Sequence, residues 1–118
     1  MAPITTIVHF QVPAENVERF LDFWKASFLH VMTVQPGLIG GTIHRGIDED
    51  GPHQFINVAR WESARALQDG LRATGRALHH EGVEVAQVFR ELGVTVSQDD
   101  YTEEVHYSPA SDPSLVGA

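Results

Sequence analysis

The stretch from Pro36 to Ser63 constrains the fold of this chain more than any other. It opens with a Pro-Gly pair that ends a helical pattern, and it closes with Ser63, a residue type that commonly caps helix N-termini. Between them, two apolar segments, residues 38–47 and 53–61, flank a polar turn over residues 48–52. A turn of that length favours a hairpin of antiparallel strands. The stretch therefore predicts a helix, a hairpin and a second helix in direct succession.

Two further elements precede this stretch. Residues 4–12 alternate between apolar and polar side chains and stop at Pro13, as expected for a strand. Residues 14–35 carry apolar side chains at spacings of three and four, which is the pattern of an amphipathic helix. The first half of the chain thus predicts the order strand, helix, strand, strand.

The second half predicts more helix and one last strand. We expect a short helix that begins after Ser63 and ends near Gly70, because glycine weakens a helix interior. Further helical segments are expected over residues 72–80 and 83–92, with Gly93 as the residue that ends the second one. Residues 94–107 then hold the last strand, in two pieces around the Asp-Asp pair at 99–100.

The order β-α-β-β-α-β predicts an α+β, ferredoxin-like protomer with an antiparallel sheet and its helices on one face. We assign residues 1–107 to this single domain and expect residues 108–118 to form a disordered tail. A lone sheet leaves its second face uncovered. Because the first strand has bulky groups on both faces, we expect a second copy to cover the bare face in a C2 homodimer.

Composition excludes several classes of function. The chain has no cysteine, which rules out disulfides, thiolate nucleophiles and cysteine-based metal sites. Its formal charge of −8, from 16 acidic and 8 basic residues, disfavours nucleic acid and anionic membranes as partners. No apolar run approaches the roughly 20 residues that cross a bilayer, and the N-terminus lacks a signal-peptide pattern. These features predict a cytoplasmic protein.

Residues 36–40, the hairpin and residues 57–63 together resemble the antibiotic biosynthesis monooxygenase family over about residues 4–96. The resemblance implies a dimeric α+β barrel with a pocket between each sheet and its own helices. It also implies an activity: members similar to this chain use O2 to oxygenate aromatic polyketide phenols or anthrones without metal, flavin or haem. Those members carry an Asn and a Trp at the spacing of Asn57 and Trp61. Leu67 stands where many of them place a substrate-anchoring Tyr.

A second branch of the same family degrades haem, and similarity to that branch implies haem as the alternative cofactor. Its iron-binding histidine falls near His79 and His80. Gly70 stands where that branch needs a second Trp, and the first strand lacks its Asn. The resemblance therefore favours a cofactor-independent enzyme, with a haem-binding or haem-degrading monooxygenase as the alternative. A non-oxidative metabolite-binding protein, cyclase or isomerase on the same fold is a further one.

Oxygenation without a cofactor requires a substrate that can be deprotonated and a dry pocket that stabilises the oxyanion. His79 or His80 is the expected base, since histidine titrates near neutrality, although the pair also fits a solvent-exposed helix face. Asn57 could donate its amide to the substrate oxygen or satisfy backbone groups. Trp61 could line the pocket and offer its N–H as a hydrogen-bond donor, or it could belong to the core.

Four further residues are assigned to the substrate pocket. They are His9, His44, Trp24 and Leu67. Trp24 belongs to the apolar stripe of the first helix, so it also fits a plain core position. His9, His44 and His106 could share a sheet face and form a three-histidine metal site, but nothing in the sequence fixes their register, and we assign no metal.

Overall fold

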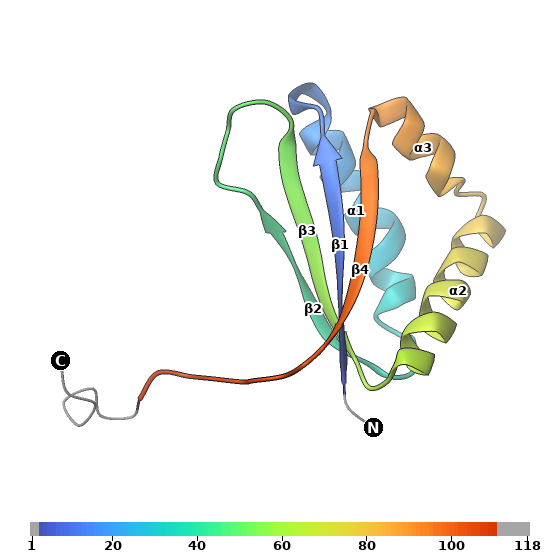
Figure 1. Ribbon diagram of the computed structural model, residues 1–118. Helices are drawn as coiled ribbons and strands as arrows, with labels where there is room; N and C mark the ends of the chain where they lie inside the picture. Colours follow the sequence, from blue (N-terminus) through green and yellow to red (C-terminus); the bar gives the residue numbers. More distant parts are fainter. Residues whose placement is uncertain (1–2, 111–118) are drawn as a thin grey trace.

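A four-stranded antiparallel sheet with helices on one face forms the body of the protein, as Figure 1 shows. The structure, a computed structural model, describes residues 3–110. Its strands lie in the order β2-β3-β1-β4. The elements, in chain order, are β1 (Ile4–Val12), η1 (Ala14–Asn16), α1 (Val17–Met32), β2 (Leu38–Arg45), β3 (His53–Trp61), α2 (Ala64–His80), α3 (Val85–Leu92) and β4 (Thr95–Thr102). The predicted ferredoxin-like α+β fold is confirmed, with α3 as an additional helix before the last strand.

Strand alternation decides which side chains face the helices. Along β3, Phe55, Asn57, Ala59 and Trp61 are all buried, while the residues between them are more exposed. Because successive strand side chains point to opposite faces, these four share the face that the helices cover. Asn57 and Trp61 therefore lie on one strand face.

An aromatic cluster joins the sheet to α1. The Phe20 ring lies 5.0 Å from the Phe10 ring and 5.4 Å from the Phe55 ring, measured between centroids. Phe20 comes from α1, Phe10 from β1 and Phe55 from β3, so one buried side chain fixes the helix against two strands. Burial of three rings contributes several kcal/mol, at about 1.5–3 kcal/mol for each large apolar side chain. This cluster is part of the hydrophobic core between the sheet and α1.

The predicted break at Gly70 is wrong, because α2 runs without interruption from Ala64 to His80. Ser63 caps it as predicted, with its Oγ accepting a hydrogen bond from the Ala66 amide at 3.1 Å. Gly70 is buried within the helix, and a Cβ added there would overlap the six-membered ring of Trp61. The glycine therefore makes room for the indole and does not end the helix.

Helix and strand ends differ from the prediction by a few residues. The first helix starts with the short η1 and ends at Met32 rather than near residue 35. Gly93 ends α3 with a φ of 71°, the left-handed conformation expected of a helix-terminating glycine. The last strand is continuous and ends at Thr102, so the predicted pieces around residues 99–100 and up to residue 107 are wrong. Of the predicted tail, residues 111–118 lie outside the described part.

The face of the sheet opposite the helices is covered by no element within residues 3–110. At its centre lie three half-buried apolar side chains, Ile7, Ile56 and Val58. His9 and His44 flank Ile56 in the strand register, one on each side. No helix in the described range is long and apolar enough to cross a membrane. The predicted homodimer through this face stays a prediction.

Candidate functional site

A cavity of about 180 Å3 lies between the helix-covered face of the sheet and the helices. Its lining combines aromatic and aliphatic side chains with a few polar ones. The lining residues are Thr6, Val8, Phe10, Trp24, Phe28, Met32, Asn57, Ala59, Trp61, Leu71, Phe89, Val96 and Gln98. We call this the inner cavity. Small-molecule sites have this general character, mostly apolar with a few convergent polar groups.

The floor of the inner cavity is a row of small side chains that crosses the sheet. Ala59 on β3 is paired with Thr6 on β1 and with Gly41 on β2. Of these three, Thr6 and Ala59 line the inner cavity, and their small side chains leave space between the sheet and the helices. Gly41 lies against the backbone of β3, where an added Cβ would sit 3.1 Å from the Val58 carbonyl oxygen.

Aromatic rings from α1, α3 and β1 form the walls of the inner cavity. Trp24 and Phe28, four residues apart on α1, are stacked with ring centroids 5.9 Å apart and an interplanar angle of 15°. Phe10 of β1 and Phe89 of α3, which also line the cavity, meet edge to face with ring centroids 5.9 Å apart. The flat, apolar walls suit an aromatic ligand.

Two predicted catalytic residues, Asn57 and Trp61, line the inner cavity together. Asn57 is 6% exposed, and Trp61 is fully buried. The indole Nε1 of Trp61 has no hydrogen-bond acceptor among residues 3–110. Leaving a buried donor unpaired costs about 1–3 kcal/mol, so such groups in native proteins usually have an unseen partner or a functional role. Nε1 has almost no accessible surface, so a ligand oxygen in the cavity would supply the acceptor only after the indole or its neighbours shift.

Two of the residues assigned to the substrate pocket come from the helices, and their positions differ. Trp24 lines the inner cavity as expected. Leu67 does not; it is buried in a cluster with Ala59 and Trp61, apart from the cavity lining. The reason is helical register, since α2 presents Leu71, one turn later, to the cavity instead.

None of the histidines, all of which lie within residues 3–110, lines the inner cavity. His9 and His44 occupy the opposite face of the sheet, contrary to their assignment to the pocket, because they alternate with helix-facing neighbours. His79 and His80 are exposed at the end of α2, and His79 pairs with Glu84 at 2.9 Å. The structure thus separates the expected histidine base from Asn57 and Trp61.

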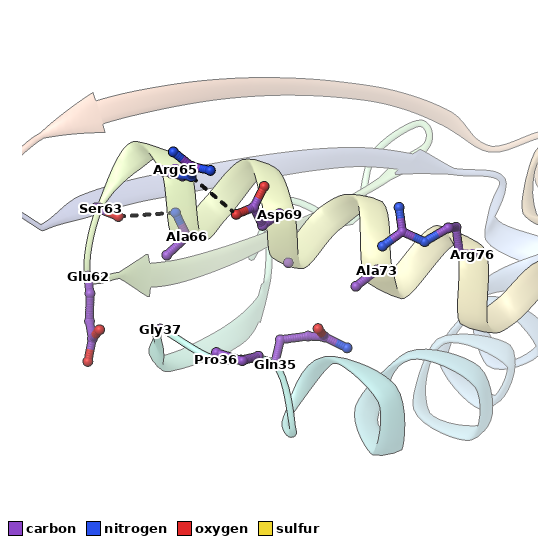
Figure 2. Close-up of a pocket in the computed structure, with 11 residues that line it drawn as sticks. Gln35, Pro36, Gly37, Glu62, Ser63, Arg65, Ala66, Asp69, Ala73 and Arg76 are labelled. Carbon is purple, nitrogen blue, oxygen red and sulfur yellow. Dashed lines mark hydrogen bonds and ion pairs between the residues drawn. The ribbon is translucent and has the colours of Figure 1, made fainter.

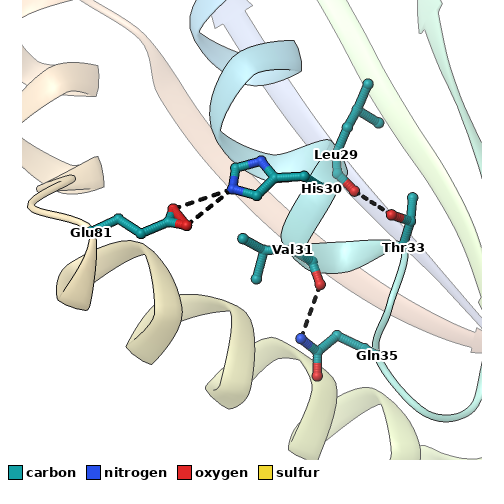
Figure 3. Close-up of polar contacts among 6 residues, drawn as sticks. All are labelled: Leu29, His30, Val31, Thr33, Gln35 and Glu81. Carbon is teal, nitrogen blue, oxygen red and sulfur yellow. Dashed lines mark hydrogen bonds and ion pairs between the residues drawn. The ribbon is translucent and has the colours of Figure 1, made fainter.

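A different histidine has a structural role at the same end of the molecule. His30 of α1 contacts both carboxylate oxygens of Glu81, just after α2, at 3.0 and 3.3 Å, as Figure 3 shows. Its side chain is 55% exposed, so the pair contributes little to stability, in the range of about 0–1 kcal/mol. It links the ends of α1 and α2 outside the inner cavity.

The outer side of α2 carries a second, larger hollow, shown in Figure 2. It measures about 480 Å3 and lies between α2 and the turn that connects α1 to β2. Its rim is charged, and the Arg65–Asp69 pair within it is 3.7 Å long and largely exposed. No buried unpaired donor or acceptor of the described residues lines this groove. The inner cavity is therefore the better candidate site.

The side chains present do not fit the alternative cofactor, haem. The histidine that the resemblance implies as the iron ligand is absent from the cavity lining within the described residues. The Trp61 ring fills the space that a side chain at Gly70 would need, so a second indole at that position could not coexist with Trp61. The described residues also contain no group of three or more His, Asp or Glu arranged to hold a metal ion, and His106 lies beyond the last strand.

Sequence reasoning missed Thr6 and Gln98, the other two polar groups of the cavity lining. Thr6 interrupts the apolar face of β1 between Ile4 and Val8, which was a usable signal. Gln98 could not be placed, because the register of the last strand was unknown before the structure.

The fold and the site define a class of protein: ferredoxin-like domains with an aromatic-lined cavity between the sheet and the helices. A sequence model of the family described as antibiotic biosynthesis monooxygenase matches residues 3–82. The chain belongs to that family. A search of curated proteins found no match.

Three solved structures are similar to this chain. A protein from Shewanella loihica PV-4 is 29% identical over 91% of this chain and 97% of that one, with a TM-score of 0.68. SnoaB, a cofactor-independent oxygenase from Streptomyces nogalater, is 25% identical over 90% of this chain and 97% of that one, with a TM-score of 0.63. A dimeric ferredoxin-like protein from an uncultured marine organism has a TM-score of 0.72 at 7% identity, over 91% and 100% of the two chains, a likeness of fold alone.

Proposed function

We propose that the protein is a cofactor-independent monooxygenase that oxidises a small aromatic or polyketide-like molecule with O2 in the inner cavity. Family membership and the similarity to SnoaB support an oxygenase. The observation that carries the proposal is that Asn57 and fully buried Trp61, whose Nε1 is unpaired, both line one aromatic-lined cavity. These groups supply donors where a substrate oxygen would lie.

The overall reaction balances without an added reductant. A ring CH2 group reacts with O2 to give a C=O group and one water molecule, so the substrate itself provides the electrons. The ring CH2 group loses a proton to solvent, and the resulting carbanion passes one electron to O2. The substrate radical and superoxide then combine to form the C–O bond of a peroxide. The O–O bond of that peroxide breaks with loss of the remaining C–H proton to give the C=O group and hydroxide, and the hydroxide takes up the first proton to form the water molecule. A cavity that excludes water protects these species from side reactions.

The chain's own residues would bind and orient the substrate. Trp61 Nε1 and the Asn57 amide donate hydrogen bonds to substrate oxygen atoms, and such donors stabilise negative charge that develops on oxygen. Trp24 and Phe28 hold the ring by stacking. Because His79 and His80 are exposed and absent from the lining, the proposal gives them no catalytic role.

We also propose that the protein acts as a cytoplasmic C2 homodimer through the uncovered sheet face. Ile7, Ile56 and Val58 at its centre form the apolar part of a self-complementary patch.

Oxygen uptake tests the proposed function. The purified protein is mixed with a panel of anthrones and hydroquinones in an oxygen electrode, with product analysis by mass spectrometry. We expect turnover that falls at least tenfold in Asn57→Ala and Trp61→Phe, with His79→Ala as a control that keeps full activity. No uptake with any panel member, or equal activity in all variants, contradicts the proposal. A ligand that binds and is returned unchanged indicates a non-oxidative binding protein instead.

A further inference from the structure

We propose that Asp100 is a positioning residue that turns Thr6 into a hydrogen-bond acceptor, so that the inner cavity selects ligands bearing a ring hydroxyl. This inference rests on the proposed function only in taking the inner cavity as the binding site. It concerns the β4 side of the cavity, where neither the family resemblance nor the sequence patterns had placed a functional group.

The geometry begins with a buried hydroxyl. Thr6 is 2% exposed and lines the inner cavity. Its Oγ1 lies 2.6 Å from Oδ1 of Asp100, which is its direct partner in the β1–β4 register. An ionised carboxylate has only acceptor sites, so the proton in this short hydrogen bond is donated by Thr6. The hydroxyl of Thr6 is therefore fixed in one orientation.

A fixed hydroxyl has a fixed polarity toward the cavity. Threonine has a single O–H proton and two lone pairs, and its proton is engaged with Asp100. What Thr6 can offer a ligand is thus a lone pair, which accepts from an O–H or N–H group and repels a carbonyl or ether oxygen. The cavity consequently pairs an acceptor on β1 with the free donor of Trp61 on β3.

The same carboxylate oxygen holds a second lining residue. Gln98 Nε2 donates to Asp100 Oδ1 at 3.1 Å, and Gln98 lines the inner cavity from β4. Asp100 itself is exposed and absent from the lining. Its contribution is therefore indirect, since it acts by orienting two side chains that a ligand would touch.

The neighbouring Asp99 provides a matched control. It is the same residue type on the same strand, it is also exposed, and it pairs with Ile7. Because strand side chains alternate, Asp99 belongs to the opposite face of the sheet from Asp100 and Thr6. Removing either carboxylate changes net charge equally, but only Asp100 contacts the cavity residues.

Two probes of nearly equal shape test the selection. 4-Methylphenol donates a hydrogen bond, and 4-fluorotoluene does not; each has a single ring, which suits a 180 Å3 cavity because a cavity of about 150 Å3 already accepts benzene. Binding is measured by NMR titration of the intact 118-residue protein, without turnover. We expect wild type to prefer the phenol roughly tenfold, the worth of one well-made hydrogen bond.

The variants separate positioning from folding. Thr6→Val should lose the preference for the phenol while keeping affinity for 4-fluorotoluene, and Thr6→Ser should restore it. Asp100→Ala should reduce the preference severalfold, because the freed hydroxyl rotates and can donate as well as accept, while Asp99→Ala should match wild type.

The proposal is overturned by an unchanged preference in Asp100→Ala, by a preference that survives Thr6→Val, or by wild type binding neither probe. A selective cavity without oxygen uptake would refute the proposed function alone, and oxygen uptake without this selectivity would refute the positioning role alone.

Discussion

The contact between Gly70 and Trp61 gives a prediction whose magnitude follows from the structure. A Cβ added at Gly70 would overlap Cζ3 and Cη2 of Trp61, well inside the 3.5–4.0 Å of an ordinary carbon contact. The ring or the helix must therefore retreat by roughly 1 Å. Overpacking of this kind costs about 1–3 kcal/mol, whereas replacing glycine by alanine in a helix interior gains up to about 1 kcal/mol.

Gly75 separates the cost of overpacking from the gain in helix propensity, because it lies in the same helix and an added Cβ there has no neighbour within 4 Å. Gly75→Ala should therefore stabilise the protein by up to about 1 kcal/mol, while Gly70→Ala should be about 1–3 kcal/mol less stable than Gly75→Ala. Urea unfolding measures the difference, and the indole N–H resonance of Trp61 should shift only in Gly70→Ala. Equal stabilities with an unmoved Trp61 resonance would refute the packing argument.

Three further predictions concern the cavity floor, the histidines and the open sheet face. Ala59→Leu should fill the floor of the inner cavity and abolish binding of 4-methylphenol in an NMR titration; retained binding would place the ligand elsewhere. The double variant His79→Ala, His80→Ala should unfold in urea with a free energy within about 0.5 kcal/mol of wild type, since both side chains are exposed. Titration with hemin should give the same absorbance change in this variant as in wild type. A Soret band that is lost in the variant would restore the haem alternative. Ile56→Lys should convert the dimer to a monomer in light scattering, because it puts a charge at the centre of the apolar patch, whereas a wild type that is already monomeric would contradict the dimer.

The fold was predictable because most of its signals are local. Alternation fixed β1 and β3 to their observed ends, and Ser63 and Gly93 behave as the cap and the terminating residue that their types suggest. The break at Gly70 was a wrong prediction for a physical reason. Helix propensity opposes glycine by only about 1 kcal/mol, and the packing of the Trp61 ring against it outweighs that preference.

The site was predictable only where one strand decides it. Asn57 and Trp61 share a face by simple alternation, so their joint presence in the cavity lining followed from spacing. The histidines required knowledge of tertiary register, and they lie on the wrong face or on the exposed end of α2. Asp100 meets Thr6 across 94 positions of sequence, a pairing that no local pattern contains.

Isotope labelling measures the central claim most directly. If the inner cavity catalyses cofactor-independent monooxygenation, turnover of an active anthrone under 18O2 should place one labelled oxygen atom in the product carbonyl and the other in water. The label should disappear together with activity when Asn57 or Trp61 is replaced. A product oxygen derived from water, or labelled product formed equally well by Asn57→Ala and Trp61→Phe, would contradict the account.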